Sequence, residues 1–176
     1  MLNSKKCIFC APFGILLGHI VCKQRLLVDP AKIALILSLP PLTNVNMLRV
    51  TLGHTGYYRK FIRGCAAITA PMEKLLKKDA IFIWSPKFQS SFDTLKAKMA
   101  STPILVFLDW NKEFHVHVDA SSVALGVVLT QPSEGDLDHR IAFASRKFSF
   151  AKKNYTTIER EGLAMVYALH KFRNYL

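Results

Sequence analysis

Cysteine is scarce in this sequence, and no uninterrupted apolar run is long enough to cross a membrane. Cys7, Cys10, Cys22 and Cys65 are too few and too irregularly spaced for the disulfide framework of a small secreted protein. Cys7 and Cys10 form a CxxC pair, but no second pair follows at zinc-ribbon spacing, which favours reduced thiols over a metal knuckle. The apolar stretch at residues 8–22 contains proline and glycine and is too short to span ~30 Å of hydrocarbon, so we expect an intracellular, non-secreted protein with no membrane partner.

Acidic residues are scarce as well. The 176-residue chain has 24 Lys and Arg against 12 Asp and Glu, a net charge of +12. Twelve of the basic but only three of the acidic residues lie at positions 1–80, whereas the remaining chain is nearly balanced. This excess predicts a polyanionic partner that binds mainly to the first part. With 51% hydrophobic residues the chain can bury a core as one ordinary domain or two small ones, and its length excludes a large barrel.

Turn and capping signals divide the basic part into a hairpin and helices. A turn at Phe13–Gly14, between apolar runs at 7–11 and 15–22, predicts a β-hairpin. Asp29 before Pro30 opens a short helix, and a longer helix begins at Thr43 or Asn44 and continues to about residue 63. Another short helix is expected after Pro71.

The second part is predicted to contain one amphipathic helix, three strands and a closing helix. Ser85–Pro86 starts a helix that ends near Ser101, before a linker at residues 102–103. The period then changes to two, which predicts strands at 114–118, 124–130 and 141–145, with a loop around Gly135 before the last of them. Thr156 and Glu159 form a capping box for a long helix to residue 172. The fold class is therefore α+β.

Asp119 is the first candidate for chemistry, because it ends an apolar strand and is followed by small residues that leave room around its carboxylate. On strand geometry His115, His117 and Asp119 share one face. That pattern also suggests a histidine-metal hydrolase, but such a strand normally belongs to a barrel longer than this chain. We therefore interpret the two histidines as packed or hydrogen-bonded side chains.

Glu161 is the second candidate, because it lies in the first turns of the closing helix. Acidic residues are favoured there by the helix dipole alone, so a structural role is the alternative. One carboxylate from a strand and one from a helix packed over that strand can, however, share divalent metal ions for phosphodiester hydrolysis. Asp119 and Glu161 together are thus a candidate catalytic and metal-binding pair.

Four long motifs resemble a known family. The strings LGHTGYYRKFIRG at 52–64, APMEKLLKKD at 70–79, VDAS at 118–121 followed by GVVLTQ, and the final NYTTIEREGLAMVYALHKFRNYL are similar to the polymerase polyprotein of gypsy-class LTR retrotransposons, of plant type. The resemblance covers essentially the whole chain. It implies a β-hairpin and helical thumb region followed by a partial RNase H-like β-β-β-α unit.

The resemblance also implies domain bounds and a nucleic-acid interface. Residues 1–27 would form the edge of the reverse transcriptase palm with a primer-grip-like hairpin, 28–80 a thumb-like region, 81–111 a connecting segment and 112–176 a partial RNase H-like domain. The partner would be an RNA–DNA hybrid or a template–primer duplex, together with the remainder of the polyprotein. Gly53 lies inside the predicted helix, where glycine lowers helix stability by about 1 kcal/mol relative to Ala. Close approach of the helix to a partner would explain a glycine at this position. The residues expected to contact nucleic acid are Leu17, Gly18, Arg49, Gly53, Tyr57, Arg59, Lys60 and Arg63.

In the RNase H-like part the resemblance implies that Asp119 is the first catalytic aspartate and Glu161 the catalytic glutamate. Both would bind Mg²⁺, or Mn²⁺ in its place. The family's next metal-binding aspartate and the polymerase aspartates fall outside residues 1–176, so the chain is expected to be a fragment that is inactive alone. A non-enzymatic nucleic-acid-binding remnant of a transposable element is the alternative. The expected location is the cytoplasm, in a virus-like particle, or the nucleus.

Overall fold

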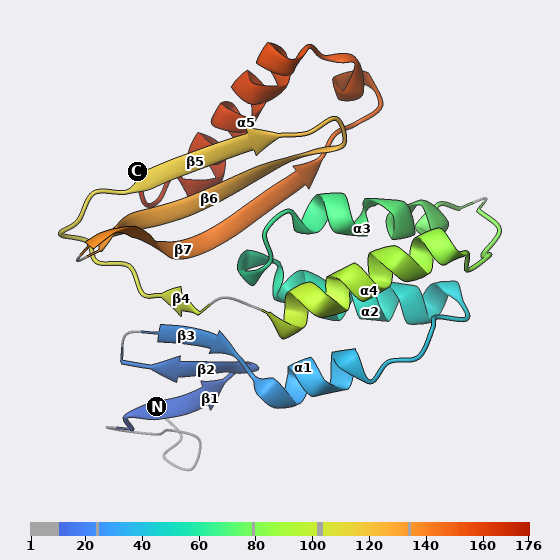
Figure 1. Cartoon of the computed structure of the whole chain (residues 1–176), viewed down its shortest axis with the longest axis horizontal. Coiled ribbons are helices and arrows are strands. Elements are labelled where there is room, and N and C mark those ends of the chain that lie inside the picture. The colour runs from blue at the N-terminus through green and yellow to red at the C-terminus, as the bar shows by residue number, and fades with distance from the viewer. Residues whose placement is uncertain (1–10, 24, 79, 102–103, 134) are drawn as a thin grey trace, which may run out of the picture.

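The computed structural model describes residues 11–23, 25–78, 80–101, 104–133 and 135–176. Two antiparallel sheets are joined by a helical region that lies between them (Figure 1). The fold is thus α+β, as expected. The elements in chain order are β1 (Phe13–Leu16), β2 (His19–Cys22), β3 (Arg25–Val28), α1 (Pro30–Leu37), α2 (Val45–Tyr57), η2 (Arg59–Phe61), α3 (Cys65–Glu73), η3 (Lys74–Leu76), α4 (Pro86–Ala100), β4 (Leu105–Val106), β5 (His115–Ala120), β6 (Ala124–Ser133), β7 (Gly135–Lys147), η4 (Ala151–Asn154) and α5 (Thr157–Phe172).

The first sheet has the strand order β1-β2-β3-β4 and contains the hairpin. Its turn is at Leu17–Gly18, not at Phe13–Gly14, because Leu16 pairs with His19. Both turn residues have positive φ, 49° at Leu17 and 75° at Gly18, which suits the right-handed twist of a two-residue hairpin. Residues 7–10 of the predicted first strand, with the CxxC pair, and the linker at 102–103 lie outside the described residues.

The helical region follows its capping signals closely at the starts of helices and less closely at their ends. The Asp29 side chain accepts from the Ala31 N–H at 2.9 Å, and Asn44 accepts from the Met47 N–H at 2.9 Å, so these two predicted N-caps are confirmed. Ser85 precedes α4 as predicted, but its side chain makes no capping hydrogen bond. Helix α2 ends at Tyr57, not at about residue 63 as predicted, and is followed by the 3₁₀ turn η2. The short helix begins at Cys65 rather than after Pro71.

Pro71 lies near the C-terminal end of α3, where one missing main-chain N–H interrupts a helix that is about to end. Pro71 therefore does not start the short helix, contrary to the prediction. The principal core of the protein lies among α2, α3, α4 and the 3₁₀ turn η2. Its fully buried side chains include Leu42, Leu48, Phe61, Met72, Phe92, Leu95 and Met99.

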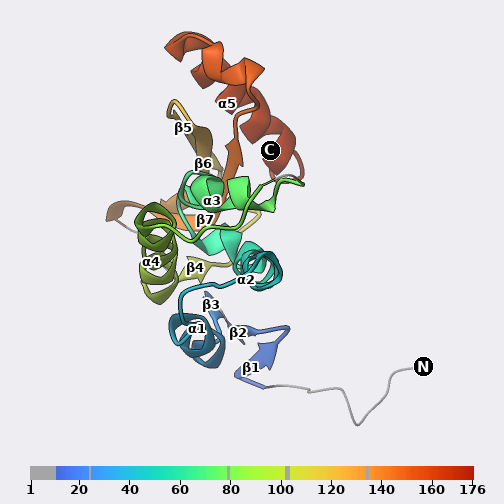
Figure 2. The same cartoon turned by 90° about the vertical axis from the view of Figure 1, so that its right-hand side faces the viewer.

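Helices lie on both sides of the second sheet, β5-β6-β7, but on one side they cover only β6 and β7, and β5 stands clear of them (Figure 2). Helix α5 covers one face through a core that contains Val127, Leu129 and Ala168. The helical region lies against the other face, and Phe143 of β7 is part of its core. Strand β7 starts at Gly135, where a loop was expected, and β6 and β7 are both longer than predicted. Two register shifts near Thr130 and Gln131 interrupt their pairing.

Ser145 of β7 connects the second sheet to the helical region. Its carbonyl accepts from Arg59 Nη2 at 2.7 Å, and its Oγ accepts from the Ala66 N–H at 3.0 Å. Lys147 and Glu73 add an ion pair between the same elements. The two parts of the chain therefore pack through specific polar contacts as well as apolar ones.

No helix within the described residues is long and apolar enough to span a bilayer.

Candidate functional site

Asp119 lies at the end of β5, opposite Gly126 of β6. Its side chain is on the face of the sheet turned toward the helical region, whereas Val116 and Val118 pack on the face covered by α5. The period-two assignment is therefore confirmed. Asp119 is exposed and lines a cavity of ≈ 200 Å³ together with Arg63.

Glu161 is exposed on α5, two residues after Glu159 of the predicted capping box, which is present. The neighbouring Arg160 donates from Nη1 to the Ser121 carbonyl at 3.2 Å, and Ser121 follows Asp119 by two positions. This bond holds the start of α5 against the end of β5, so both candidate carboxylates lie at the same end of the sheet.

The two carboxylates are nevertheless not a complete metal site. Among the described residues, no hydrogen bond or ion pair joins Asp119 to Glu161, and no group of three or more His, Cys, Asp or Glu side chains is arranged to hold a metal ion. Carboxylate oxygens are suitable ligands for Mg²⁺, but this ion requires six ligands in nearly octahedral geometry. Their roles as catalytic and metal-binding residues stay predictions.

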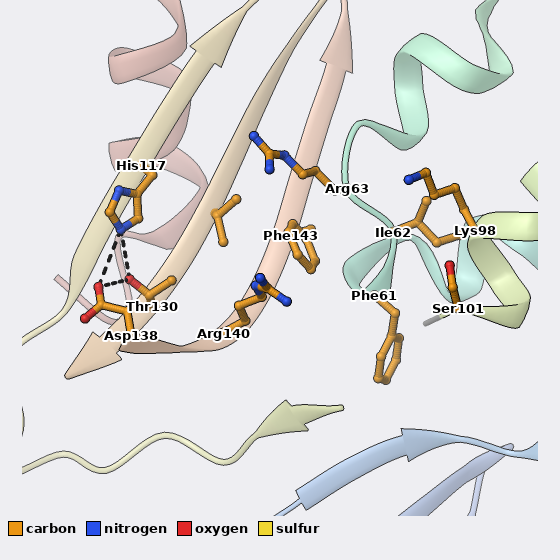
Figure 3. A pocket seen from close by; sticks show the side chains of 11 residues that line it. Phe61, Ile62, Arg63, Lys98, Ser101, His117, Thr130, Asp138, Arg140 and Phe143 are labelled. Carbon is orange, nitrogen blue, oxygen red and sulfur yellow. Dashed lines mark hydrogen bonds and ion pairs between the residues drawn. The ribbon is translucent and has the colours of Figure 1, made fainter. Parts of the chain in front are cut away.

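His115 and His117 belong to a hydrogen-bonded network, as expected. Asp138 Oδ2 lies 2.8 Å from His115 Nδ1. The same oxygen accepts from Thr130 Oγ1 at 2.8 Å, and His117 Nε2 lies 3.1 Å from the Thr130 hydroxyl (Figure 3). The hydrogen bond to Asp138 raises the pKa of His115, and the same bond lowers the pKa of Asp138. The network joins all three strands beside the register shift.

The hairpin turn is joined to α2 by two adjacent tyrosines. Tyr57 donates to the Leu17 carbonyl at 2.9 Å, and Tyr58 donates to the Gly18 carbonyl at 3.3 Å. A Cβ on Gly18 would lie only 2.6 Å from the Tyr58 hydroxyl oxygen. The expected primer-grip-like turn and thumb-like helix therefore lie in direct contact.

Sequence reasoning missed His19 and Tyr58, which hold this contact together. The His19 ring lies 5.1 Å from the ring of Tyr57, 5.5 Å from Tyr58 and 5.5 Å from Phe61, measured between centroids. Burial, and secondarily the charge of Lys60, lowers the pKa of His19. The available signal was a histidine directly after a turn glycine and two consecutive aromatic residues at the end of a helix.

Gly53 and Tyr57 lie on an open surface of α2. A Cβ added at Gly53 would meet no described atom within 4 Å, apart from neighbouring backbone, so packing inside the chain does not explain this glycine. Tyr57 is 51% exposed, and Val50 beside it is 58% exposed. These residues border a groove of ≈ 630 Å³ between α1 and α2. Approach of a partner to this open surface stays a prediction.

The four basic candidates differ in their surroundings. Arg49 lies on exposed α2, and the Lys60 ammonium lies 5.4 Å from the centre of the Phe61 ring, where burial lowers its pKa. Arg59, in contrast, donates to Ser145, and Arg63 lines the cavities beside the second sheet. Contacts of these residues with nucleic acid stay predictions.

The fold and the site define a protein class with a β-hairpin, a helical region and an RNase H-like β-β-β-α unit. Residues 84–176 match the family described as "RNase H-like domain found in reverse transcriptase", and the chain belongs to this family. It is 40% identical, over 99% of its length, to the Retrovirus-related Pol polyprotein from transposon 297 of Drosophila melanogaster. It is 31% identical over its whole length to the Transposon Tf2-3 polyprotein of Schizosaccharomyces pombe.

The chain spans 16% of the fly polyprotein and 13% of the yeast polyprotein. Among solved structures, a foamy viral protease-reverse transcriptase in complex with RNA/DNA hybrid is similar over 97% of this chain and 23% of that one, with a TM-score of 0.82 and 18% identity. Another, described as "dRH" and in complex with ds DNA, matches 92% of this chain and 28% of that one with a TM-score of 0.81 and 18% identity. The fold is therefore that of part of a reverse transcriptase.

Proposed function

We propose that this chain is part of the reverse transcriptase and RNase H of a gypsy-class LTR retrotransposon, of plant type. In this proposal residues 1–27 belong to the palm edge, 28–80 to the thumb, 81–111 to the connecting segment and 112–176 to the RNase H-like domain. The polyprotein would act inside the cell, in virus-like particles in the cytoplasm or in the nucleus. The four long motifs support the class, and the polyproteins of a fly and a yeast support the broader group.

The first part would bind an RNA–DNA hybrid or a template–primer duplex. The observation that carries this proposal is the pair of tyrosine bonds between the turn and α2, which fixes Leu17 beside the exposed face of Tyr57 and Gly53. An exposed aromatic ring can stack on a base or sugar. The missing side chain at Gly53 lets the sugar-phosphate backbone of a nucleic acid approach the helix closely. The surplus of positive charge in residues 1–80 supplies attraction to phosphates.

Binding to a fluorescently labelled RNA–DNA hybrid, followed by anisotropy, tests this proposal. Raising salt from 50 to 200 mM should weaken the affinity by about ten- to a thousandfold, since several phosphate contacts are involved. Tyr57→Ala should weaken it by about five- to a hundredfold, because one stacked base contributes about 1–3 kcal/mol. Tyr155→Ala, a change at a tyrosine beside α5, is the control. An affinity that does not change with salt concentration would contradict the proposal. Equal effects of Tyr57→Ala and Tyr155→Ala would also contradict it.

In the longer polyprotein, the second part would hydrolyse RNA in RNA–DNA hybrids. Asp119 and Glu161 would hold Mg²⁺ or Mn²⁺, and their exposed oxygen ligands at one end of the sheet fit this role in part. The ion would supply charge stabilisation and activate water. The remaining ligands must come from other parts of the polyprotein, from water or from the substrate, so residues 1–176 alone are expected to cleave poorly or not at all.

A non-enzymatic nucleic-acid-binding remnant is the second candidate, favoured by the absence of a group of three metal-binding side chains in the described part of the chain. Mg²⁺-dependent cleavage by a polyprotein extended beyond residue 176, and its loss in Asp119→Asn or Glu161→Gln, would decide for the enzyme. An extended Asp119→Asn protein with full activity would decide for the remnant.

A further inference from the structure

A cavity of ≈ 490 Å³ lies between the helical region and the second sheet, and three cationic side chains line it. Arg63 follows η2, Lys98 lies on α4 and Arg140 lies on β7. Figure 3 shows the first two extending from the helical side and Arg140 from the strand side. The volume is within the range of pockets that hold small ligands, about 300–1,000 Å³. Three separate elements thus bring positive charge to one concavity.

No carboxylate that the structure describes neutralises these cations. None of the three forms a hydrogen bond or an ion pair with another residue that the structure describes. The cavity contains one acidic side chain, Asp138, and its Oδ2 is already engaged by His115 and Thr130. Other surface cations of the protein do have partners, as Lys147 has Glu73. The cavity therefore has a net positive charge and unused hydrogen-bond donors.

We propose that Arg63, Lys98 and Arg140 form a binding site for the phosphate group of an anionic ligand. Guanidinium groups bind phosphate oxygens in pairs, and a lysine adds a mobile point charge. The Ser101 and Thr130 hydroxyls also line the cavity, but they already donate to Ala97 and Asp138, so the three cations supply the donors for a phosphate. The apolar side is formed by residues such as Ile62 and Val128, which would exclude water from one side of the ligand.

Arg63 also lines the neighbouring cavity that contains Asp119. A phosphate held by Arg63 would therefore lie beside the candidate catalytic carboxylate, and a nucleic-acid strand could pass from one cavity to the other. This use of the site rests on the proposed function. A free phosphate-bearing ligand, such as a nucleotide or pyrophosphate, has the same binding chemistry and is the other source.

A charge-matched pair of double variants tests the site in the full 176-residue chain. Lys98→Gln with Arg140→Gln removes two cations from the cavity. Lys87→Gln with Arg146→Gln removes two cations from the same helix and the same strand, outside the residues that line it. Circular dichroism checks that both fold. One measurement is the salt dependence of binding to a labelled RNA–DNA hybrid, and the other is calorimetric titration with inorganic pyrophosphate.

If a strand occupies the site, the cavity variant should bind the hybrid about tenfold more weakly at low salt, and its salt slope should fall by roughly 0.9 for each lost contact, unlike the control. If a free ligand occupies it, only the cavity variant should lose pyrophosphate binding, with hybrid binding equal in both variants. Equal behaviour of both variants in both measurements overturns the phosphate site. If the wild-type chain does not bind the hybrid, the proposed nucleic-acid-binding function is wrong. The pyrophosphate titration alone then shows whether the phosphate site exists.

Discussion

Replacing Gly18 by alanine tests whether the hairpin turn and α2 are fitted together around a missing side chain. Gly18 has a φ of 75°, a left-handed conformation that costs a residue with a Cβ about 1–2 kcal/mol. The new Cβ would also lie 2.6 Å from the Tyr58 hydroxyl oxygen, well inside van der Waals contact. The substitution therefore combines backbone strain with a steric clash.

The clash is difficult to relieve. Tyr58 is 5% exposed, and its ring lies 5.1 Å from that of Tyr57 and 5.5 Å from that of His19. Moving its hydroxyl away from the turn would break the bond to the Gly18 carbonyl, which contributes about 1 kcal/mol. Together with the backbone strain, Gly18→Ala should lower the free energy of unfolding by about 2–3 kcal/mol.

Urea unfolding followed by tryptophan fluorescence measures this loss, since Trp84 packs against the principal core. Gly14→Ala is the matched control, because its Cβ would meet no described atom within 4 Å and its φ is not positive, and its effect should stay within about 0.5 kcal/mol. In a Tyr58→Phe background, Gly18→Ala should cost only the backbone part, about 1–2 kcal/mol. Equal losses at Gly18 and Gly14 would refute the reasoning.

Three further predictions concern the second sheet. Ser145→Ala should lower the free energy of unfolding by about 1–3 kcal/mol, because the Ala66 N–H loses its acceptor, and a urea midpoint within error of wild type would contradict this. The pKa of His115 is raised and that of Asp138 is lowered, so the bond between the two side chains stabilises the fold most at about pH 4–6.5. This stabilisation is lost as the pH rises through the folded-state pKa of His115 or falls through the folded-state pKa of Asp138. Thermal unfolding of Asp138→Asn should therefore differ from wild type more at pH 5.5 than at pH 8, and a constant difference would count against the bond. Asp119→Asn, at an exposed position, should change stability by less than about 0.5 kcal/mol, so lost activity in the polyprotein could not be ascribed to unfolding.

Features that depend on a few neighbouring residues could be predicted from the sequence. The caps at Asp29, Asn44 and Thr156 are where the side chains indicate them, since a cap needs only a hydrogen bond two or three residues away. The alternation around Asp119 and the hydrogen-bonded histidines were also predictable, because a strand fixes which side chains share a face.

Features that depend on distant parts of the chain could not be predicted. Two glycines were available for the hairpin, and Gly18 is chosen over Gly14 by a register with β3 and by Tyr58, forty positions away. The sequence also does not show that Arg59 lies beside the Ser145 carbonyl, 86 positions further along the chain. Strand β4 has only two residues and no local signal, because it forms by pairing with β3.

That short strand determines when the first sheet can be completed during synthesis. Leu105 pairs with Leu26, so all of the helices from α1 to α4 lie between two adjacent strands of one sheet. A chain emerging from a ribosome can form the hairpin early, but it cannot complete the sheet until β4 has left the exit tunnel. Closing so long a loop costs entropy before its contacts form, which slows folding. A cut between α4 and β4 would therefore leave the edge of β3 without its partner.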